Sequence, residues 1–271
     1  MVVRGIDFSG AAEPGEDIWI TEGRLDGRTL ELTACRSAAE AFETRGREAI
    51  LSSLVDLLRS STGTTGIDVS LGLPAALLPD GVAEWPDAVR WFAETFADAD
   101  ASEMREYLKE RARASDESGV ELKRQADTAV GANSPYGFIT YYQTLHGIRD
   151  VLAPLVAEDA VRVPPMQSAG KRNVIETYPA GTLRRLRTVD TQYKESGEET
   201  VDRRAEILRV LKSDRGDIVL SLDEETREIA LQSPGADALD SIVAAVATAR
   251  AVRNDFATDY DYRDCEGYIY S

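Results

Sequence analysis

The sequence has few cysteines and no long apolar run. Its two cysteines, Cys35 and Cys265, lie far apart and near no motif with metal-ligand spacing, so we expect reduced thiols in a cytoplasmic protein. No stretch approaches the roughly 20 apolar residues that cross a bilayer, and we expect no membrane partner. The first residues show no basic start, apolar core or small-residue cleavage site, so we also expect no signal peptide.

Lysine is also scarce. The 271 residues carry 48 acidic and 31 basic side chains, of which 26 are Arg and 5 are Lys, and the formal net charge is −17. An acidic, lysine-poor surface is typical of haloarchaeal proteins, in which molar salt screens the self-repulsion. We therefore expect a halophilic, archaeal protein. The chain has no overall basic field, so its charge gives no indication of nucleic-acid binding.

The first quarter of the chain predicts three strands and then a helix. Residues 2–10 form a short apolar run closed by Gly and Ser, which is typical of a buried strand. Residues 17–25 and 29–37 flank an Asp-Gly pair, a strong hairpin signal, so the three strands form an antiparallel meander. Residues 47–61 carry leucines and isoleucine at helical spacing, and residues 64–74 predict a fourth strand.

The rest of the chain is mainly helical. Residues 75–173 predict a helical insertion packed on the sheet edge, and residues 173–181 predict a fifth strand. A long final helix is expected over residues 233–255, with Ser233 as N-cap and Pro234 at the first helical position. The terminal "EGYIY" is aromatic and short, which suggests an edge strand. A homodimer contact through that edge is one interpretation, and the oligomeric state stays open.

This order of elements narrows the fold. Three meander strands, a crossover helix, a fourth strand, an insertion and a fifth strand followed by helices predict an RNase H-like α/β fold. We expect one domain over residues 1–271, with a mixed five-stranded sheet and helices on both faces. Strands one to three are antiparallel, and strands four and five are parallel to the first. The first strand then lies centrally, beside the fourth.

A five-residue motif occurs twice in the chain. Residues 5–9 read "GIDFS" and residues 66–70 read "GIDVS", each at the end of an apolar run. In the predicted sheet the two motifs lie side by side and end at the same edge. Ligand sites in open α/β sheets form outside the carboxyl ends of the strands, so Asp7 and Asp68 are expected to point into one site. The glycines of both motifs are expected to let neighbouring backbone pack closely.

Further carboxylates are expected at the same edge. Asp237 and Asp240 are three residues apart at the start of the final helix, and they share one helical face. Glu176 stands near the end of the fifth strand. Carboxylates about 4 Å apart repel by roughly 4 kcal/mol per pair at an effective dielectric near 20. One or two Mg²⁺ or Mn²⁺ ions would relieve that repulsion, and such ions support hydrolytic phosphoryl transfer.

Several motifs in this order resemble a known family over nearly the whole chain. The motifs are "GIDFSGA", "GIDVSLGLP", "ETYPA", "YK", "DALDS" and "EGYIY". They resemble the domain of unknown function 429 family, whose members are described as predicted RNase H-like nucleases. The order of acids is also similar to that of RuvC-type resolvases in the same superfamily.

The resemblance implies roles for the acidic residues. Asp7, Asp68 and Asp240 would be metal ligands, and Asp237 and Glu176 would be further catalytic acids. The resolvases use Glu on the fourth strand, so the shorter side chain of Asp68 puts the position or presence of one metal in doubt. The implied activity is a metal-dependent nuclease or phosphodiesterase.

Basic and aromatic side chains are candidates for substrate contact. Arg124, Lys171, Arg172 and Lys194 could meet a phosphate, and an ion pair or a solvated surface is the other interpretation for each. Four aromatic residues between 136 and 142 could stack on bases or belong to the core. They are Tyr136, Phe138, Tyr141 and Tyr142.

Two other functions remain open. A nucleotide-binding phosphotransferase of the actin and sugar-kinase type shares this kind of sheet, and "DFSGA" would then bind phosphate. Such proteins need a duplicated domain and a Gly-rich adenosine loop, and neither is apparent here. A non-catalytic binding module that retains the fold is the other alternative. The sequence does not distinguish DNA from RNA as a substrate.

Overall fold

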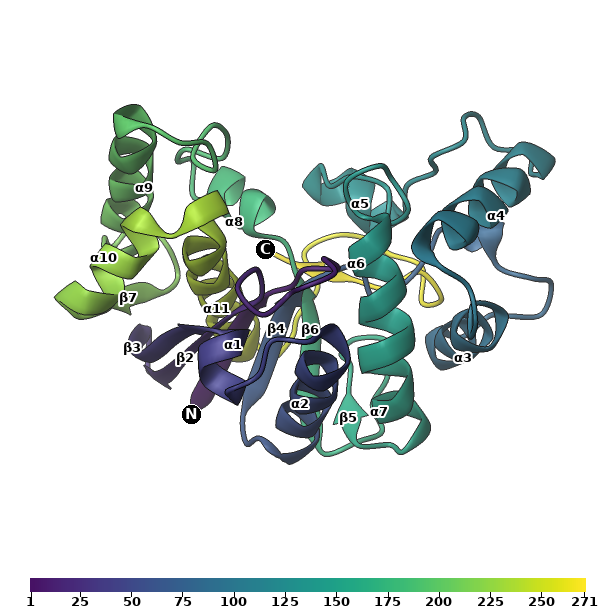
Figure 1. Ribbon diagram of the computed structural model, residues 1–271, viewed down its shortest axis with the longest axis horizontal. Coiled ribbons are helices and arrows are strands. Elements are labelled where there is room, and N and C mark those ends of the chain that lie inside the picture. The colour runs from purple at the N-terminus through teal and green to yellow at the C-terminus, as the bar shows by residue number, and fades with distance from the viewer.

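Eight strands form one mixed sheet in the computed structural model, which describes residues 1–271 (Figure 1). The strands are β1 (Val2–Asp7), β2 (Trp19–Asp26), β3 (Thr29–Ser37), β4 (Thr64–Asp68), β5 (Val161–Arg162), β6 (Arg172–Thr177), β7 (Val219–Ser221) and β8 (Ile269–Tyr270). The order across the sheet is β5-β6-β4-β1-β2-β3-β7, and β8 pairs with the carboxyl-terminal end of β6.

The five central strands confirm the predicted topology. β1, β2 and β3 form an antiparallel meander, and β4 and β6 are parallel to β1. This arrangement is consistent with an RNase H-like fold. Three short strands, β5, β7 and β8, extend the sheet beyond the five expected. Two or three residues are too few to show the alternation that predicts a strand, although the terminal segment was expected to be an edge strand.

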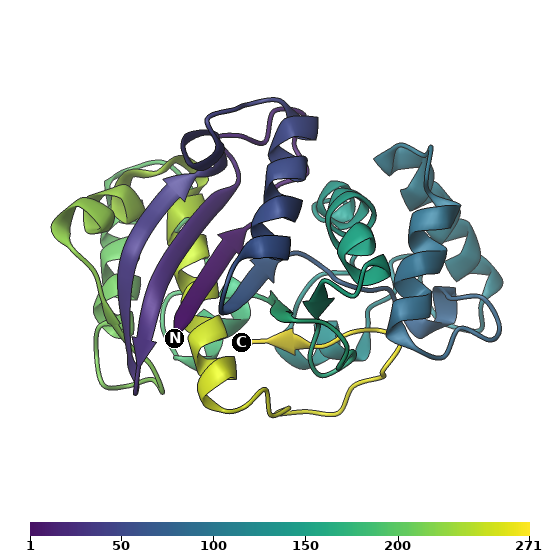
Figure 2. The same ribbon diagram turned by 90° about the horizontal axis from the view of Figure 1, so that it is seen from below.

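Helices cover both faces of the sheet, as predicted (Figure 2). They are α1 (Ala38–Phe42), α2 (Arg47–Ser60), η1 (Ala75–Leu77), α3 (Trp85–Thr95), α4 (Ala101–Ala114), α5 (Gln125–Val130), α6 (Tyr141–Leu145), the π-helix η2 (His146–Leu152), α7 (Ala153–Ala157), α8 (Pro179–Arg185), α9 (Glu198–Leu211), α10 (Glu224–Gln232), η3 (Pro234–Ala236) and α11 (Asp237–Arg253). None of them combines the length and apolar character that a membrane span requires.

Two apolar cores lie on the opposite faces of the sheet. One contains Ile6 and Ile67 with the apolar faces of α2 and of the helices from η1 to α7. The other contains Val3 with residues of α9, α10 and α11. Because side chains alternate along a strand, neighbouring positions of β1 serve different cores. The helices between β4 and β6 extend the molecule on one side of the sheet (Figure 1).

The start of the last helix differs from the expectation. Ser233 and Pro234 begin a 3-10 turn, and Gly235 and Ala236 have φ values of 65° and 68°. These left-handed conformations break the helix between Pro234 and Asp237, so α11 begins at Asp237 rather than at Pro234. The sequence does not reveal the positive φ of Gly235 or Ala236. Ser233-Pro234 is a favourable helix start, and an alanine rarely has positive φ.

The glycines of the repeated motif allow α11 to approach the sheet. A Cβ atom on Gly5 would lie 2.1 Å from the backbone nitrogen of Ala245, and one on Gly66 would lie 2.0 Å from Oγ1 of Thr248. The close packing predicted from the sequence is therefore present, and its partner is α11. Gly5 and Asp7 share one face of β1, so the face that packs on α11 also carries the aspartate.

Candidate carboxylate site

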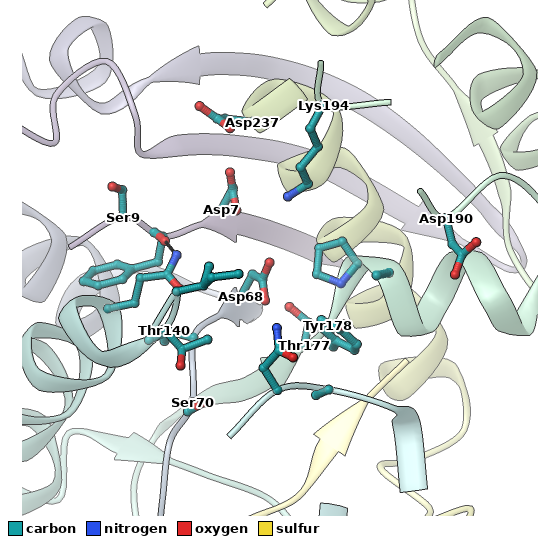
Figure 3. A pocket seen from close by; sticks show the side chains of 18 of the residues that line it. Asp7, Ser9, Asp68, Ser70, Thr140, Thr177, Tyr178, Asp190, Lys194 and Asp237 are labelled. Atoms are coloured by element: carbon teal, nitrogen blue, oxygen red, sulfur yellow. Dashed lines mark hydrogen bonds between the residues drawn. The ribbon is translucent and has the colours of Figure 1, made fainter. Parts of the chain in front are cut away.

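Asp7 and Asp68 end two neighbouring parallel strands at the same edge of the sheet. They are direct partners in the register between β1 and β4. Both side chains point into one pocket, together with Asp237 and Lys194 (Figure 3). The cavity measures about 610 Å³. Its acidic lining residues are Asp7, Asp17, Asp68, Asp127, Glu176, Asp190, Glu195 and Asp237. The predicted convergence of the two motifs is therefore present.

Burial raises the pKa values of these acids, and the surrounding protein supplies little positive charge to offset their negative charge. Burial first, and Asp240 second, raise the pKa of Asp7 well above its ordinary value. Burial also raises the pKa of Asp68 to about 7 and that of Asp237 to about 6. The carboxylates of Asp7 and Asp68 accept no hydrogen bond from the protein, and neither forms an ion pair within 4 Å. Paired carboxylates of this kind favour a nearby positive charge.

Asp240 lies deeper, one helical turn beyond Asp237, and it has partners inside the protein. Its side chain is completely buried. The Tyr193 hydroxyl donates to Oδ1 at 2.9 Å, and the Lys194 ammonium forms an ion pair with Oδ2. The two acids that the sequence placed on one helical face thus differ in role: Asp237 lines the cavity, and Asp240 holds the segment that carries Tyr193 and Lys194.

Glu176 belongs to a second buried network beside the cavity. Its oxygens accept hydrogen bonds from Arg124 at 2.5 and 2.8 Å, and one also accepts from the Leu71 backbone nitrogen at 2.8 Å. Arg124 is 0% exposed and also binds Asp127. The expectation that Arg124 contacts substrate is therefore corrected, because its guanidinium is paired with Asp127 and Glu176 inside the protein. Glu176 lines the cavity as predicted, but Arg124 already binds its carboxylate.

Lys171 and Arg172 lie at the wrong end of their strand for substrate contact. They stand at the start of β6, whereas the cavity lies beyond its end at Thr177. The two ends of β6 are five residue steps apart, or about 16 Å at roughly 3.3 Å per step. The expectation that these two side chains meet a phosphate in the site is therefore corrected. Of the four predicted basic contacts, Lys194 alone lines the cavity.

The helical insertion supplies a wall of the site that the sequence did not indicate. Ile139, Thr140 and Gln143 line the cavity opposite the strands. The Gln143 side-chain nitrogen donates to the Phe8 carbonyl at 2.5 Å, which ties α6 to the segment after β1. Tyr193 was given no role from the sequence, although it belongs to the "YK" motif. Its role could not be deduced locally, because its acidic partner lies 47 residues further along the chain.

The donor set fits one hard divalent cation. Asp7 and Asp68 offer oxygen ligands, and Asp7 is more than nine-tenths buried without a hydrogen-bond partner. No group of three His, Cys, Asp or Glu side chains forms a preassembled metal site. Mg²⁺ commonly uses only one or two carboxylates and completes its shell with water and substrate oxygens. Two aspartates therefore suffice for one such ion.

The fold and site define an α/β protein with an acidic cavity at the carboxyl edge of a mixed sheet. The chain belongs to the DUF429 family: the model described as "Protein of unknown function (DUF429)" matches residues 24–262. The matched range contains Asp68, Asp237 and Asp240, and Asp7 precedes it. Comparison with curated proteins gives no match, and comparison with solved structures gives none either.

Proposed function

We propose that this chain is a divalent-metal-dependent phosphodiesterase that acts on nucleic acid. Asp7 and Asp68 would hold Mg²⁺ or Mn²⁺. The observation that carries the proposal is their pairing: a buried Asp7 and a half-buried Asp68, in register on adjacent parallel strands, with no hydrogen bond to satisfy either carboxylate. Such carboxylates are costly to keep ionised unless a cation joins them.

The residues around the pair suit hydrolysis of a phosphodiester. A divalent ion would stabilise negative charge on a phosphoryl oxygen. Asp237 stands in the cavity with its pKa raised to about 6, so near neutral pH it can accept the proton of an attacking water. The Lys194 ammonium faces the same cavity and favours a bound phosphate. Asp240 keeps that lysine in place.

An exposed aromatic rim supports nucleic acid as the substrate class. Phe138 is 75% exposed and Ile139 is 76% exposed, and Ile139 also lines the cavity. The Arg105 guanidinium lies 5.8 Å from the Phe138 ring centroid and 5.3 Å from that of Tyr141. A base leaving the cavity would meet this surface and stack on it. Tyr136 of the same segment is fully buried, so it belongs to the core instead.

Calorimetric titration with Mn²⁺ in molar KCl tests the proposal. We expect the wild type to bind Mn²⁺ and Asp7→Asn to lose at least about 100-fold in affinity, because a direct ligand is removed. Asp98→Asn is the matched control, since Asp98 is an exposed acid outside the cavity. Cleavage of labelled single-stranded and duplex DNA and RNA should follow the same pattern.

Two results would redirect the assignment. If the wild type binds no Mn²⁺ but binds ATP with Mg²⁺, a phosphotransferase replaces the nuclease. If it binds neither, the chain is a binding module that retains the fold.

A further inference from the structure

Lys194 extends from the surface into the acidic site, and its ammonium lies against the buried Asp240. It reaches from the segment between α8 and α9 toward the ends of β1 and β4 (Figure 3). Its ammonium pairs with the fully buried Asp240, and Asp7 and Asp68 also act on its charge. Burial alone lowers the pKa of Lys194, but the surrounding carboxylates, Asp240 foremost, outweigh it and raise the pKa, so the side chain stays charged.

The charges around Lys194 leave room for one divalent ion. Four carboxylates gather here, those of Asp7, Asp68, Asp237 and Asp240. One ammonium and one divalent ion together would neutralise most of that charge. A second divalent ion would need Asp240, whose two oxygens are already bound by Tyr193 and Lys194.

The use of a lysine rather than an arginine at position 194 also indicates that this side chain stands where a metal ion could bind. The chain has 26 Arg and 5 Lys, yet the site uses a lysine. A lysine ammonium is a compact point charge with three donors in different directions, whereas a guanidinium is a planar fork suited to one carboxylate. Several carboxylates around one point, as at Lys194, favour the compact charge.

We propose that Lys194 permanently takes the place of a second divalent ion. The site then binds one ion, at Asp7 and Asp68, and Asp240 positions Lys194 rather than binding metal. This inference rests on the proposed function of the site. In this arrangement the charge of Lys194 lies on the side of the cavity next to α11. The exchangeable ion lies on the other side, at the ends of β1 and β4.

Mn²⁺ stoichiometry, measured by calorimetry and by electron paramagnetic resonance, tests the inference without an activity assay. We expect one ion per wild-type chain and two in Lys194→Met, because Asp240 becomes free to bind metal. Lys194→Met combined with Asp240→Asn should return to one ion. Lys171→Met is the control, since Lys171 is exposed and outside the cavity.

The possible results separate this inference from the proposed function. No bound ion in the wild type would contradict both. Two ions in the wild type would overturn the role of Lys194 and leave the metal site standing, and so would a single ion in Lys194→Met.

If circular dichroism shows that Lys194→Met does not fold, the Mn²⁺ affinity of Asp240→Asn tests the inference instead. A Mn²⁺ affinity within about tenfold of the wild type supports the inference, and a loss above about 100-fold makes Asp240 a ligand.

Discussion

Asp7 and Asp68 are register partners on β1 and β4, and each stands two residues after a glycine that contacts α11. Side chains two apart on a strand share a face. The glycine therefore admits the helix, and the aspartate lies at the point where the helix begins with its own acids, Asp237 and Asp240. This relationship explains why the motif occurs twice. In each copy the glycine lets α11 pack on the strand, and the aspartate two residues later lines the acidic cavity.

Metal-free protein should lose stability as the pH rises from about 4 to about 7. The pKa of Asp68 is about 7 in the folded state against an ordinary 3.8, so between those values the folded chain binds a proton that the unfolded chain does not. Stability then falls with pH, and the loss is complete above the folded pKa. Urea unfolding in EDTA between pH 5 and 8 measures it.

Asp68→Asn should flatten this pH dependence, because an amide stays neutral throughout. Asp7 and Asp237 also have raised pKa values, so part of the slope remains. Asp98→Asn should keep the wild-type slope. An unchanged slope in Asp68→Asn would show that this carboxylate does not titrate as described.

Arg124→Met should destabilise the fold by about 3–5 kcal/mol. The substitution leaves Glu176 and Asp127 buried without their cation, and breaking a buried ion pair from one side has a cost of that order. Chemical denaturation measures the free energy of unfolding. Lys171→Met, at an exposed position, should change it by less than about 0.5 kcal/mol. A fully stable Arg124→Met variant would reopen a substrate-binding role for Arg124.

Gly5→Ala should destabilise the protein by about 3 kcal/mol, because the added methyl group meets the backbone of α11. Backbone atoms cannot move aside as a flexible side chain can. Gly46→Ala is the matched control: Gly46 has an ordinary φ of −66° and open space around it. We expect the control to stay within about 1 kcal/mol of the wild type. Equal melting temperatures for the two variants would contradict the close approach of α11 to β1.

Phe138→Ala should weaken binding of single-stranded oligonucleotides while leaving Mn²⁺ affinity unchanged. Loss of one stacking contact corresponds to about 1–3 kcal/mol, or roughly 5- to 150-fold in affinity. Fluorescence anisotropy with labelled DNA and RNA measures the change. Tyr107→Ala is a useful comparison, since Tyr107 is partly exposed on α4 outside the cavity. Equal affinity for both variants would remove the rim from the proposed binding surface.

The sequence by itself determined the sheet and the identity of its acidic edge. Strand order followed from local signals: an Asp-Gly hairpin, apolar runs of strand length, and a crossover that permits one hand. The repeated "GID" then placed Asp7 and Asp68 together, because parallel neighbours end at one edge. The first turns of α11 were recognisable as acidic for the same local reason, although the helix start was misplaced by the left-handed Gly235 and Ala236.

Only the tertiary structure decided which charged residues face the cavity and which are used inside the protein. Arg124 and Lys194 both lie in polar segments, yet one is fully buried against Glu176 and the other has a 55% exposed side chain in the acidic cavity. The partners that decide this, Glu176 for Arg124 and Asp240 for Lys194, lie 52 and 46 residues away along the chain. Local sequence patterns carry the periodicity of helices and strands, but ion pairing depends on distance in space, which is set only when the insertion and α11 pack on the sheet.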